Sequence, residues 1–582
     1  MATNTRPKHF DGQQHVDTVT GDATFRFKLT FFATANFDSF PTHRKLTHSS
    51  IARPMQDPDS NQHSTPSSGR WLIAAMAFLL ISLSFLIASR RNNVDMDLFH
   101  EMCLARQFAT EGTFPQTDAF AYTPTVDRVV HHEWGTGVVA YGVIEQLGLK
   151  SRGLMALKYL LVALICLCCC LSARLRAAKW PMIVPCFALA TILGGQIGYT
   201  TIRAQLFTLL FLSVEFCLLG IDRQGKKWWI VPWLILVVVW ANMHAGILAG
   251  LGIFCFYVGF RICEPLIEKY LPGKSEQAEQ RGSNWYLVAV AMVSMLLLLV
   301  NPYGINYPFY LYYGTTLDRP MINEWKPLLS AISDSGFLIL LGVSIVLAAV
   351  GFKNTWRTRP FEVFVILLTA YLAFNHVRHL SIYAVTWACI VPASLMHSSI
   401  GKEMTNIGLR LAKPLTVVAV AAGIFCTAHA CSAKFWEMKV PAYTDQDKPL
   451  GMLYPVGAVD FLKETGFEGN LMVPFSAGAF VSWNLYPAVK VSFDSRYEVA
   501  YPAGSIERSF DFYDAKDGWQ ETLVSHGTDA VLVPYFSAIR SELDSLDEWH
   551  LLYDDSMHSV FTKRKMTADP VIVETVDFPW EF

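Results

Sequence analysis

Two acidic residues near the start of the chain, Asp95 and Asp97, have the type and spacing expected of a catalytic pair. They stand one residue apart after a long apolar stretch, and His100 and Glu101 follow about one helical turn later. A carboxylate placed in this way can take the proton of an acceptor hydroxyl in a sugar-transfer reaction. A divalent metal ion held by Asp95 and Asp97 is an alternative role for the pair, although their spacing is not diagnostic of one.

Further polar residues stand at the ends of other apolar stretches. A charged side chain at the centre of a bilayer costs about 2.5–3.5 kcal/mol on insertion scales, so a large set of them indicates a shared site. Arginine holds phosphate with two parallel hydrogen bonds, and a phosphate leaving group needs no second carboxylic acid. The residues we assign to donor or substrate binding are His132, Glu133, Arg203, His244, Glu324, Arg378 and His379.

Each of these residues also has a simpler, structural interpretation. The two aspartates could only cap a helix that begins at Leu98. The two arginines could extend toward lipid headgroups, and the histidines could be ordinary core residues. The catalytic interpretation therefore depends on all of these side chains meeting at one membrane face.

The composition is typical of a membrane protein. Of the 582 residues, 52% are hydrophobic and only 16% are charged, whereas about a quarter of the residues in soluble domains are charged. A net charge of −2 gives no basic surface for nucleic acid. Most of the twelve cysteines fall inside apolar stretches and show no metal-ligand spacing, so no disulfide framework is indicated.

Eleven apolar stretches are long enough to suggest membrane-spanning helices, which need about 17–25 residues. They lie near 71–89, 154–172, 181–199, 204–220, 228–243, 245–261, 285–301, 336–352, 360–375, 380–398 and 413–430. The sequence therefore predicts an α-helical polytopic membrane protein with about eleven transmembrane helices, and the first of them acts as an uncleaved anchor.

The distribution of Lys and Arg predicts the orientation. Basic residues are concentrated in alternate loops, which the positive-inside rule places in the cytoplasm. These loops contain Arg174, Arg176 and Lys179; Arg223, Lys226 and Lys227; Arg261, Lys269, Lys274 and Arg281; Lys353, Arg357 and Arg359; and Lys402, Arg410 and Lys413. We therefore expect the N-terminus to be cytoplasmic, and the 91–153 loop and the chain after about residue 431 to lie outside.

The segments outside the apolar stretches differ in character. Residues 1–70 are polar and rich in Thr, Ser and Pro, which predicts a disordered cytoplasmic tail, and Met55 is an alternative start. Within the first outer loop, 91–153, two amphipathic segments, Leu98–Glu111 and Trp134–Leu147, are too short to cross and predict helices along the membrane surface.

The C-terminal part, 432–582, predicts a small extracytoplasmic α/β domain. Short apolar strands expected at Asn470–Val473, Val489–Phe493, Ala530–Pro534 and His558–Thr562 alternate with helical patterns at 457–465, 505–524 and 537–546. Asp494 and Arg496 directly follow the second strand, where parallel sheets place functional loops. An ion pair that only fixes the loop is the alternative.

Several segments of the chain carry a family resemblance. They are Asp95-Met-Asp-Leu-Phe-His100, Gly112-Thr-Phe-Pro-Gln-Thr-Asp-Ala-Phe-Ala-Tyr122, His132-Glu-Trp134, Trp240-Ala-Asn-Met-His-Ala-Gly246, Asn301-Pro-Tyr-Gly304 and Glu324-Trp-Lys-Pro327, with Val489-Lys-Val-Ser-Phe-Asp-Ser-Arg496 in the C-terminal part. In these segments and in its span pattern the chain resembles a bacterial branch of the C-class (GT-C) membrane glycosyltransferases, which include protein O-mannosyltransferases and aminoarabinose transferases. The resemblance covers residues 71–430.

The resemblance implies a polyprenyl-phosphate sugar donor, a catalytic aspartate in the first outer loop, and a glycan, lipid or protein acceptor outside the bacterial inner membrane. The chain has Asp-Met-Asp where the mannosyltransferases have Asp-Glu, which leaves open which aspartate is the base. We favour Asp97, because it directly precedes the expected helix.

Two other functions fit parts of the same pattern. A secondary transporter also places polar residues between helices, but near the middle of the membrane and on broken helices in repeated halves. A non-catalytic protein of cell-envelope polysaccharide assembly would explain an outer domain, but not the clustered carboxylates.

Overall fold

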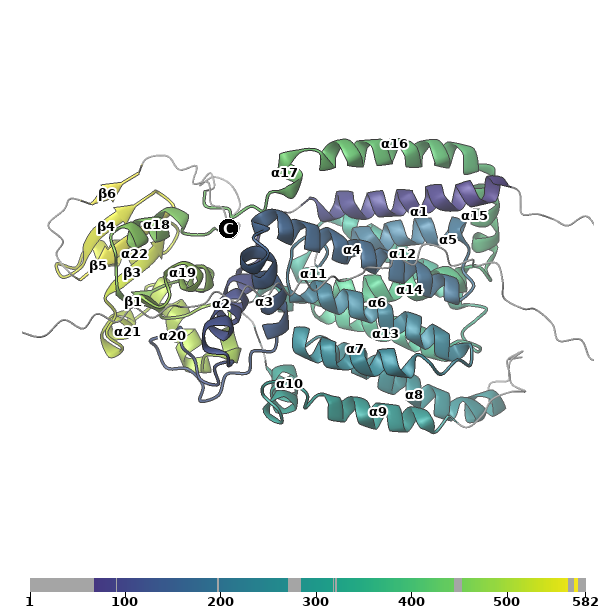
Figure 1. The fold of residues 1–582 in the computed structure, drawn as a ribbon, viewed down its shortest axis with the longest axis horizontal. Helices are drawn as coiled ribbons and strands as arrows, with labels where there is room; N and C mark the ends of the chain where they lie inside the picture. Colours follow the sequence, from purple (N-terminus) through teal and green to yellow (C-terminus); the bar gives the residue numbers. More distant parts are fainter. Residues whose placement is uncertain are drawn as a thin grey trace, which may run out of the picture. The chain divides into compact units, whose positions relative to one another are not determined.

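The computed structural model describes residues 67–90, 92–195, 198–270, 284–317, 319, 322–443, 453–563 and 570–573. The tail expected over residues 1–70 lies outside these ranges except for residues 67–70, which begin the first helix. Residues Thr65–Phe582 form one compact unit. The chain is mostly helical, with one small sheet (Figure 1).

Each of the eleven expected apolar stretches contains a helix. They are α1 (Ser67–Ala88), α4 (Lys150–Leu175), α5 (Trp180–Gly194), α6 (Ala204–Arg223), α7 (Ile230–Met243), α8 (Ile247–Tyr270), α9 (Tyr286–Leu297), α12 (Ser335–Phe352), α13 (Pro360–Asn375), α14 (Leu380–Leu395) and α16 (Ala412–Ala430). Shorter elements connect them: α10 (Asn306–Thr316), η3 (Asn323–Trp325), α11 (Leu328–Ala331), η4 (Val377–His379), α15 (Ser399–Arg410) and α17 (Ala433–Trp436).

Fewer of these helices are long enough to cross a membrane than the eleven expected. Within the described residues, α4, α6, α8, α12 and α16 have the necessary length and hydropathy. The segment Val377–Leu395 and the following helix, bent by 94°, form a sixth candidate if they count as one span. In the other apolar helices the apolar segment is only 10–17 residues long, and in α1 it is Ala75–Ala88. The structure thus shows five to six candidate spans.

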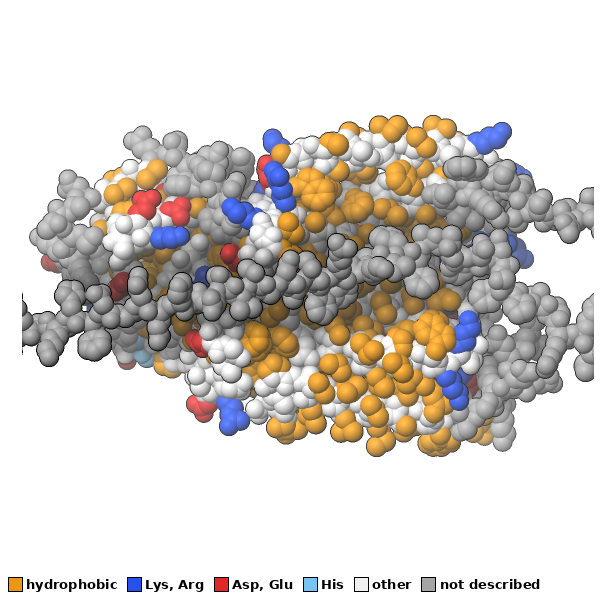
Figure 2. Space-filling model, viewed as in Figure 1, with side chains coloured by type: hydrophobic (Ala, Val, Ile, Leu, Met, Phe, Trp, Pro, Cys, Tyr) orange, Lys and Arg blue, Asp and Glu red, His pale blue; other side chains and the backbone are white. Residues whose placement is uncertain are grey.

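Burial divides the helices into a core and a periphery. Every residue of α14 is buried, and so is most of α6. Peripheral helices instead expose large apolar side chains, such as Leu167 on α4, Leu367 on α13 and Val417 on α16. Figure 2 shows hydrophobic side chains over the visible face of these helices. An apolar outer surface of this extent suggests a membrane protein.

The helix ends that carry the basic residues are tied together by ion pairs. Arg176, after α4, lies 3.1 Å from Glu362 at the start of α13. Arg223, at the end of α6, lies 2.7 Å from Glu264 on α8. Loops that are far apart in the sequence but share the same charge therefore meet at one end of the bundle.

The two expected helices of the first loop are present as α2 (Met96–Glu111) and as α3 (Trp134–Tyr141), which continues into the π-helical turn η1 (Gly142–Gln146). Gly112 ends α2 in the left-handed conformation with φ 76°, as glycine commonly does after a helix. α3 packs against one side of α2, and α19 (Gly478–Leu485) packs against another. α2 is thus enclosed by protein on two sides, and its position relative to a membrane stays a prediction.

A six-stranded sheet lies in the C-terminal part, with strand order β2-β1-β3-β5-β4-β6. Its strands are β1 (Gly469–Met472), β2 (Val489–Val491), β3 (Ala530–Pro534), β4 (His550–Asp554), β5 (His558–Thr562) and β6 (Val571–Ile572). β1 pairs in parallel with β2 and β3, whereas β5 is antiparallel to β3 and β4, and β6 is parallel to β4. The four expected strands are present, and β4 and β6 were not predicted.

Besides α19, the helices around this sheet are α18 (Val456–Glu464), α20 (Ala503–Tyr513), α21 (Trp519–Ser525) and α22 (Ile539–Asp544), together with the turn η5 (Tyr497–Val499). The 91–153 loop joins the free edge of β2: Tyr122 donates its backbone N–H to the carbonyl of Val491, and Val491 donates to Phe120. This pairing ties residues 120–122 to the sheet. The expected separate domain at 432–582 stays a prediction, because the loop and the sheet share one compact unit.

The close approach of α2 and α3 gives a test of the packing. A Cβ atom on Gly137 would lie 2.2 Å from the carbonyl oxygen of Glu101, whereas one on Gly252 of α8 would meet nothing within 4 Å. Gly137→Ala should therefore destabilise the protein by about 1–3 kcal/mol through overpacking. The matched control Gly252→Ala should leave the apparent melting temperature unchanged or raise it. Equal melting temperatures of the two variants in detergent would contradict this packing.

Candidate active site

A short backbone pairing brings the first acidic residues to the start of α6. Val94 forms a parallel bridge with Ile202, so the next residues on the two segments, Asp95 and Arg203, face each other. Asp95 is also the N-cap of α2, and its side chain accepts a hydrogen bond of 3.2 Å from the backbone N–H of Asp97. The capping interpretation of Asp95 is therefore correct, and the same carboxylate also lies beside a cation.

Arg203 holds three carboxylates together. Its guanidinium nitrogens lie 3.7 Å from Asp95, 3.4 Å from Asp97 and 2.7 Å from Glu324. Only 17% of the Arg203 side chain is exposed, so these contacts are largely shielded from water. The arginine points into the protein and pairs with acids, which excludes simple extension toward lipid headgroups.

The carboxylates around Arg203 differ in proton affinity. Burial and the charge of Asp95 raise the pKa of Asp97 well above its usual range, although Arg203 opposes them. Burial alone would raise the pKa of Glu324, but Arg203 and Arg378 lower it overall. Burial also raises the pKa of Asp95. Glu324 is therefore the firmly ionised partner of Arg203, and both aspartates have the raised proton affinity that suits a general base.

A second cluster is centred on Glu133. Its carboxylate lies 3.2 Å from Nε2 of His132 and 3.2 Å from Nε2 of His244. It also shares a hydrogen bond with Glu101, whose own pKa is raised well above its usual range by burial and by the charge of Glu133. The pKa of Glu133 is lowered because its hydrogen bonds outweigh its burial. Glu101 therefore binds a proton more strongly than Glu133 does.

The hydrogen bonds of His244 determine its tautomer. The backbone N–H of Gly246 donates to Nδ1 at 3.0 Å, so this nitrogen carries no proton. The Thr208 hydroxyl lies 2.7 Å from the same nitrogen and also accepts a hydrogen bond from the indole of Trp240. The proton of a neutral His244 is consequently on Nε2, from which it is donated to Glu133. His244 is thus part of the polar network and not an isolated core histidine.

Arg378 and His379 take different positions. The guanidinium of Arg378 lies over the ring of Trp325, 4.7 Å from its centroid, and Arg319 contacts the same ring at 4.2 Å. Nδ1 of His379 lies 3.3 Å from the carbonyl oxygen of Leu372. No ion-pair partner of Arg378 is found in the part of the chain that the structure describes, which leaves its guanidinium available to an anion. His379 lies beside Trp325 but does not reach the carboxylates.

The loop after β2 closes over α2. Arg496 pairs with Asp494 through two nitrogens and also with Asp118 of the 91–153 loop, and all three side chains are almost completely buried. Arg496 lowers the pKa of Asp494, although burial alone would raise it. Nδ1 of His100 lies 3.1 Å from the hydroxyl of Ser495. The ion-pair interpretation of this loop is correct, and the pairing extends to the 91–153 loop.

The structure brings together most of the residues expected at the site, but in adjoining clusters. Asp95, Asp97 and Glu324 surround Arg203, and His132 and His244 surround Glu133, whose charge in turn raises the pKa of Asp97. Glu101 and Asp118 were not among the predicted site residues. Of these two, only Glu101 could have been predicted from the sequence, because it follows Asp97 by four residues and therefore lies on the same face of α2.

An open hollow of about 760 Å³ lies beside the second cluster. It is lined by Phe108, Thr113, Phe114, Pro115, Gln116, Trp134 and Pro302. Trp134 directly follows Glu133, and its indole donates a hydrogen bond to Asn242. The predicted polar residues do not line this hollow, which is mainly aromatic and apolar.

No set of three or more His, Cys, Asp or Glu side chains in the described ranges has an arrangement that could hold a metal ion. The carboxylates of Asp95 and Asp97 face Arg203. Comparison of the sequence with protein-family models and with curated proteins gave no match. The geometry of the clusters therefore carries the functional argument.

Removal of the central cation provides a direct test of the Arg203 cluster. Arg203→Gln leaves three neighbouring carboxylates without their shared partner, and loss of one partner from a buried ion pair typically costs about 3–5 kcal/mol. The melting temperature of this variant in detergent should fall clearly below that of the matched control Arg152→Gln, since Arg152 on α4 is exposed. Equal melting temperatures would show that the three carboxylates do not depend on Arg203.

Proposed function

We propose that the protein is an integral membrane glycosyltransferase of the C-class that moves a sugar from a polyprenyl-phosphate donor to an acceptor at the outer membrane face. The observation that carries this proposal is the Arg203 cluster, in which a base of raised pKa lies beside firmly ionised and cationic groups. A fold of about eleven spans, with an outer C-terminal domain, belongs to the same proposal.

In the proposed reaction Asp97 is the general base. It takes the proton from the acceptor hydroxyl while the hydroxyl oxygen attacks the anomeric carbon of the sugar. The bond from this carbon to the phosphate oxygen breaks, and polyprenyl phosphate leaves with the bonding electron pair. Phosphate is a weak base and needs no proton at this step. Asp97 suits this role better than Asp95, whose carboxylate also caps α2.

The two arginines have different roles in the proposed mechanism. Arg203 fixes the carboxylates, because its nitrogens already face Asp95, Asp97 and Glu324. Arg378 binds the donor phosphate, since its guanidinium is held against Trp325 and has no carboxylate partner among the residues described here. Stacking of this kind fixes the plane of the guanidinium for two-pronged phosphate binding.

The chemistry is tested with purified protein in lipid and a panel of polyprenyl-phosphate sugars, by following the release of polyprenyl phosphate. Asp97→Asn keeps the size of the side chain but removes the base, and should lower turnover by roughly 10²–10⁴-fold. Asp95→Asn keeps the helix cap and should lower turnover less than Asp97→Asn does. Wild-type turnover in both variants, or no release with any donor, would contradict the proposal.

The pH dependence follows from the raised pKa of Asp97. A general base works only when deprotonated, so turnover should increase as the pH rises through the pKa of Asp97. The midpoint of this rise should lie above the usual value of about 4 for an aspartate. Arg378→Lys keeps the positive charge but cannot form two parallel hydrogen bonds to phosphate. It should therefore raise the KM for the donor without moving this midpoint. A midpoint at the usual aspartate value would exclude Asp97 as the base.

The orientation in this proposal follows from the basic loops and can be tested with reporter fusions. Reporters at Gly225, Lys274 and Thr405 should be cytoplasmic, and those at Tyr313 and Ser505 should be external. The active-site clusters would then face outward, where the acceptor is. An external reporter at Lys274 would overturn both the orientation and the outer location of the site.

A further inference from the structure

One acidic side chain lies inside the bundle and apart from both clusters. Glu215 is on α6, eleven residues beyond the first residue of that helix, which is about 16 Å along its axis. The side chain is completely buried, and neither carboxyl oxygen has a hydrogen-bond partner within the described part of the chain. α6 is also one of the candidate spans.

Among the described residues, the surroundings of Glu215 supply no compensating charge. α8 presents Gly250 to it, and α7 presents the ring of Trp240. Arg176 reaches the carbonyl oxygen of the adjacent residue Phe216, but its guanidinium is paired with Glu362. Burying an isolated carboxylate in such an apolar interior costs so much free energy that the neutral, protonated form is strongly favoured.

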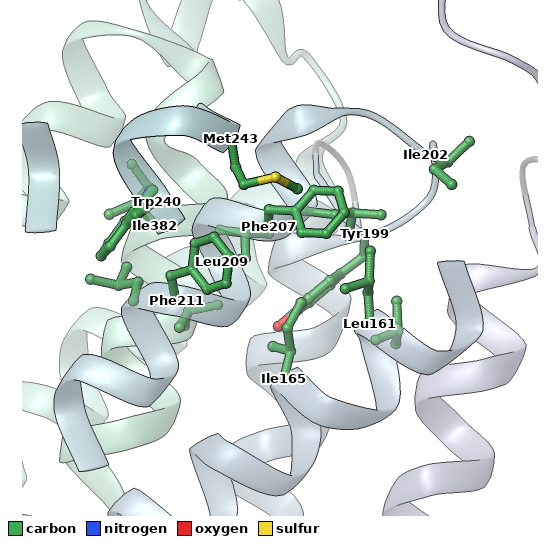
Figure 3. Close-up of a cluster of buried hydrophobic side chains, with 14 of the residues drawn as sticks. Leu161, Ile165, Tyr199, Ile202, Phe207, Leu209, Phe211, Trp240, Met243 and Ile382 are labelled. Atoms are coloured by element: carbon green, nitrogen blue, oxygen red, sulfur yellow. The ribbon is translucent and has the colours of Figure 1, made fainter. Parts of the chain in front are cut away.

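Gly250 provides the room for this carboxyl group. A Cβ atom there would lie 3.0 Å from Oε2 of Glu215 and 2.5 Å from Cζ3 of Trp240. The carboxyl group therefore lies beside the benzene edge of the Trp240 indole. Trp240 also packs against Phe211, one turn earlier on α6, at a centroid distance of 5.8 Å (Figure 3).

The opposite edge of the same indole faces the outer clusters. Nε1 of Trp240 donates a hydrogen bond of 2.9 Å to the Thr208 hydroxyl, which contacts His244, and His244 contacts Glu133. Thr208 and Glu215 are seven residues apart on α6, so they lie on the same face, two turns from each other. The Trp240 ring thus lies between Glu215 and the hydrogen-bonded chain that leads to Glu133.

We propose that Glu215 is a proton-binding site inside the helical bundle, separated from the outer polar network by the indole ring of Trp240. Its ligand is a proton, which is held on the neutral carboxyl group and exchanges outward along Thr208, His244 and Glu133 when the ring moves aside. This proposal does not depend on glycosyl transfer, because it concerns a group that the proposed reaction does not use.

Infrared spectroscopy of the full-length protein in lipid tests whether the Glu215 carboxyl group holds a proton. The spectrum of wild type minus that of Glu215→Gln should contain the carbonyl band of a protonated carboxyl group, even at mildly alkaline pH. The matched control is Glu362→Gln, which removes an acid paired with Arg176 and Arg359 and should remove carboxylate bands instead. Carboxylate bands in the Glu215 difference spectrum would overturn the proposal.

Hydrogen–deuterium exchange tests the role of Trp240. After transfer to D2O, the shift of the Glu215 carbonyl band should be slow in the wild type and faster in Trp240→Ala. Trp240→Phe keeps an aromatic ring and should give an intermediate rate, and it serves as the second variant if the alanine variant does not fold. Equal exchange rates in the wild type and a folded Trp240 variant would overturn the assignment of Trp240 as the barrier.

Discussion

Compensation of buried charge by Arg203 is the interaction on which the architecture of the site depends. Asp95 and Asp97 come from the start of α2, and Glu324 comes from a turn more than 200 residues further along the chain. Three carboxylates so close together would repel one another without a shared cation. The guanidinium at the start of α6 therefore fixes where α2 begins, where the η3 turn lies and how both face the bundle.

In the second cluster, hydrogen bonds rather than a fixed cation compensate the buried charge of Glu133. Glu133 is stabilised by Glu101 and by two histidines, and its charge increases the proton affinity of Asp97. The loop after β2 completes the enclosure, because Arg496 links Asp494 to Asp118. Residues from the 91–153 loop, the helical bundle and the loop after β2 thus form adjoining polar clusters, and burial together with the charges of Asp95 and Glu133 raises the pKa of Asp97.

Buried acidic side chains are compensated differently at the two ends and in the middle of the bundle. At one end Glu324 is held by Arg203, and at the other Glu362 is held by Arg176 and Arg359. Glu215 lies between these ends with neither a cation nor a hydrogen-bond donor among the described residues. Because a membrane interior offers no water to replace such partners, the proton itself is the simplest compensation.

The sequence alone determined where the apolar helices and most strands lie, because the length and periodicity of an apolar stretch are local properties. It failed at β4 and β6: His550–Asp554 mixes polar and apolar residues, and β6 is two residues long, so both depend on pairing with distant strands. It identified Asp95, Asp97, Glu133 and Arg203 by residue type, but not which carboxylate each cation would hold. Only the tertiary structure decided that Glu101 and Glu133 share a hydrogen bond and that Arg496 reaches Asp118, because these partners are brought together by packing rather than by spacing along the chain.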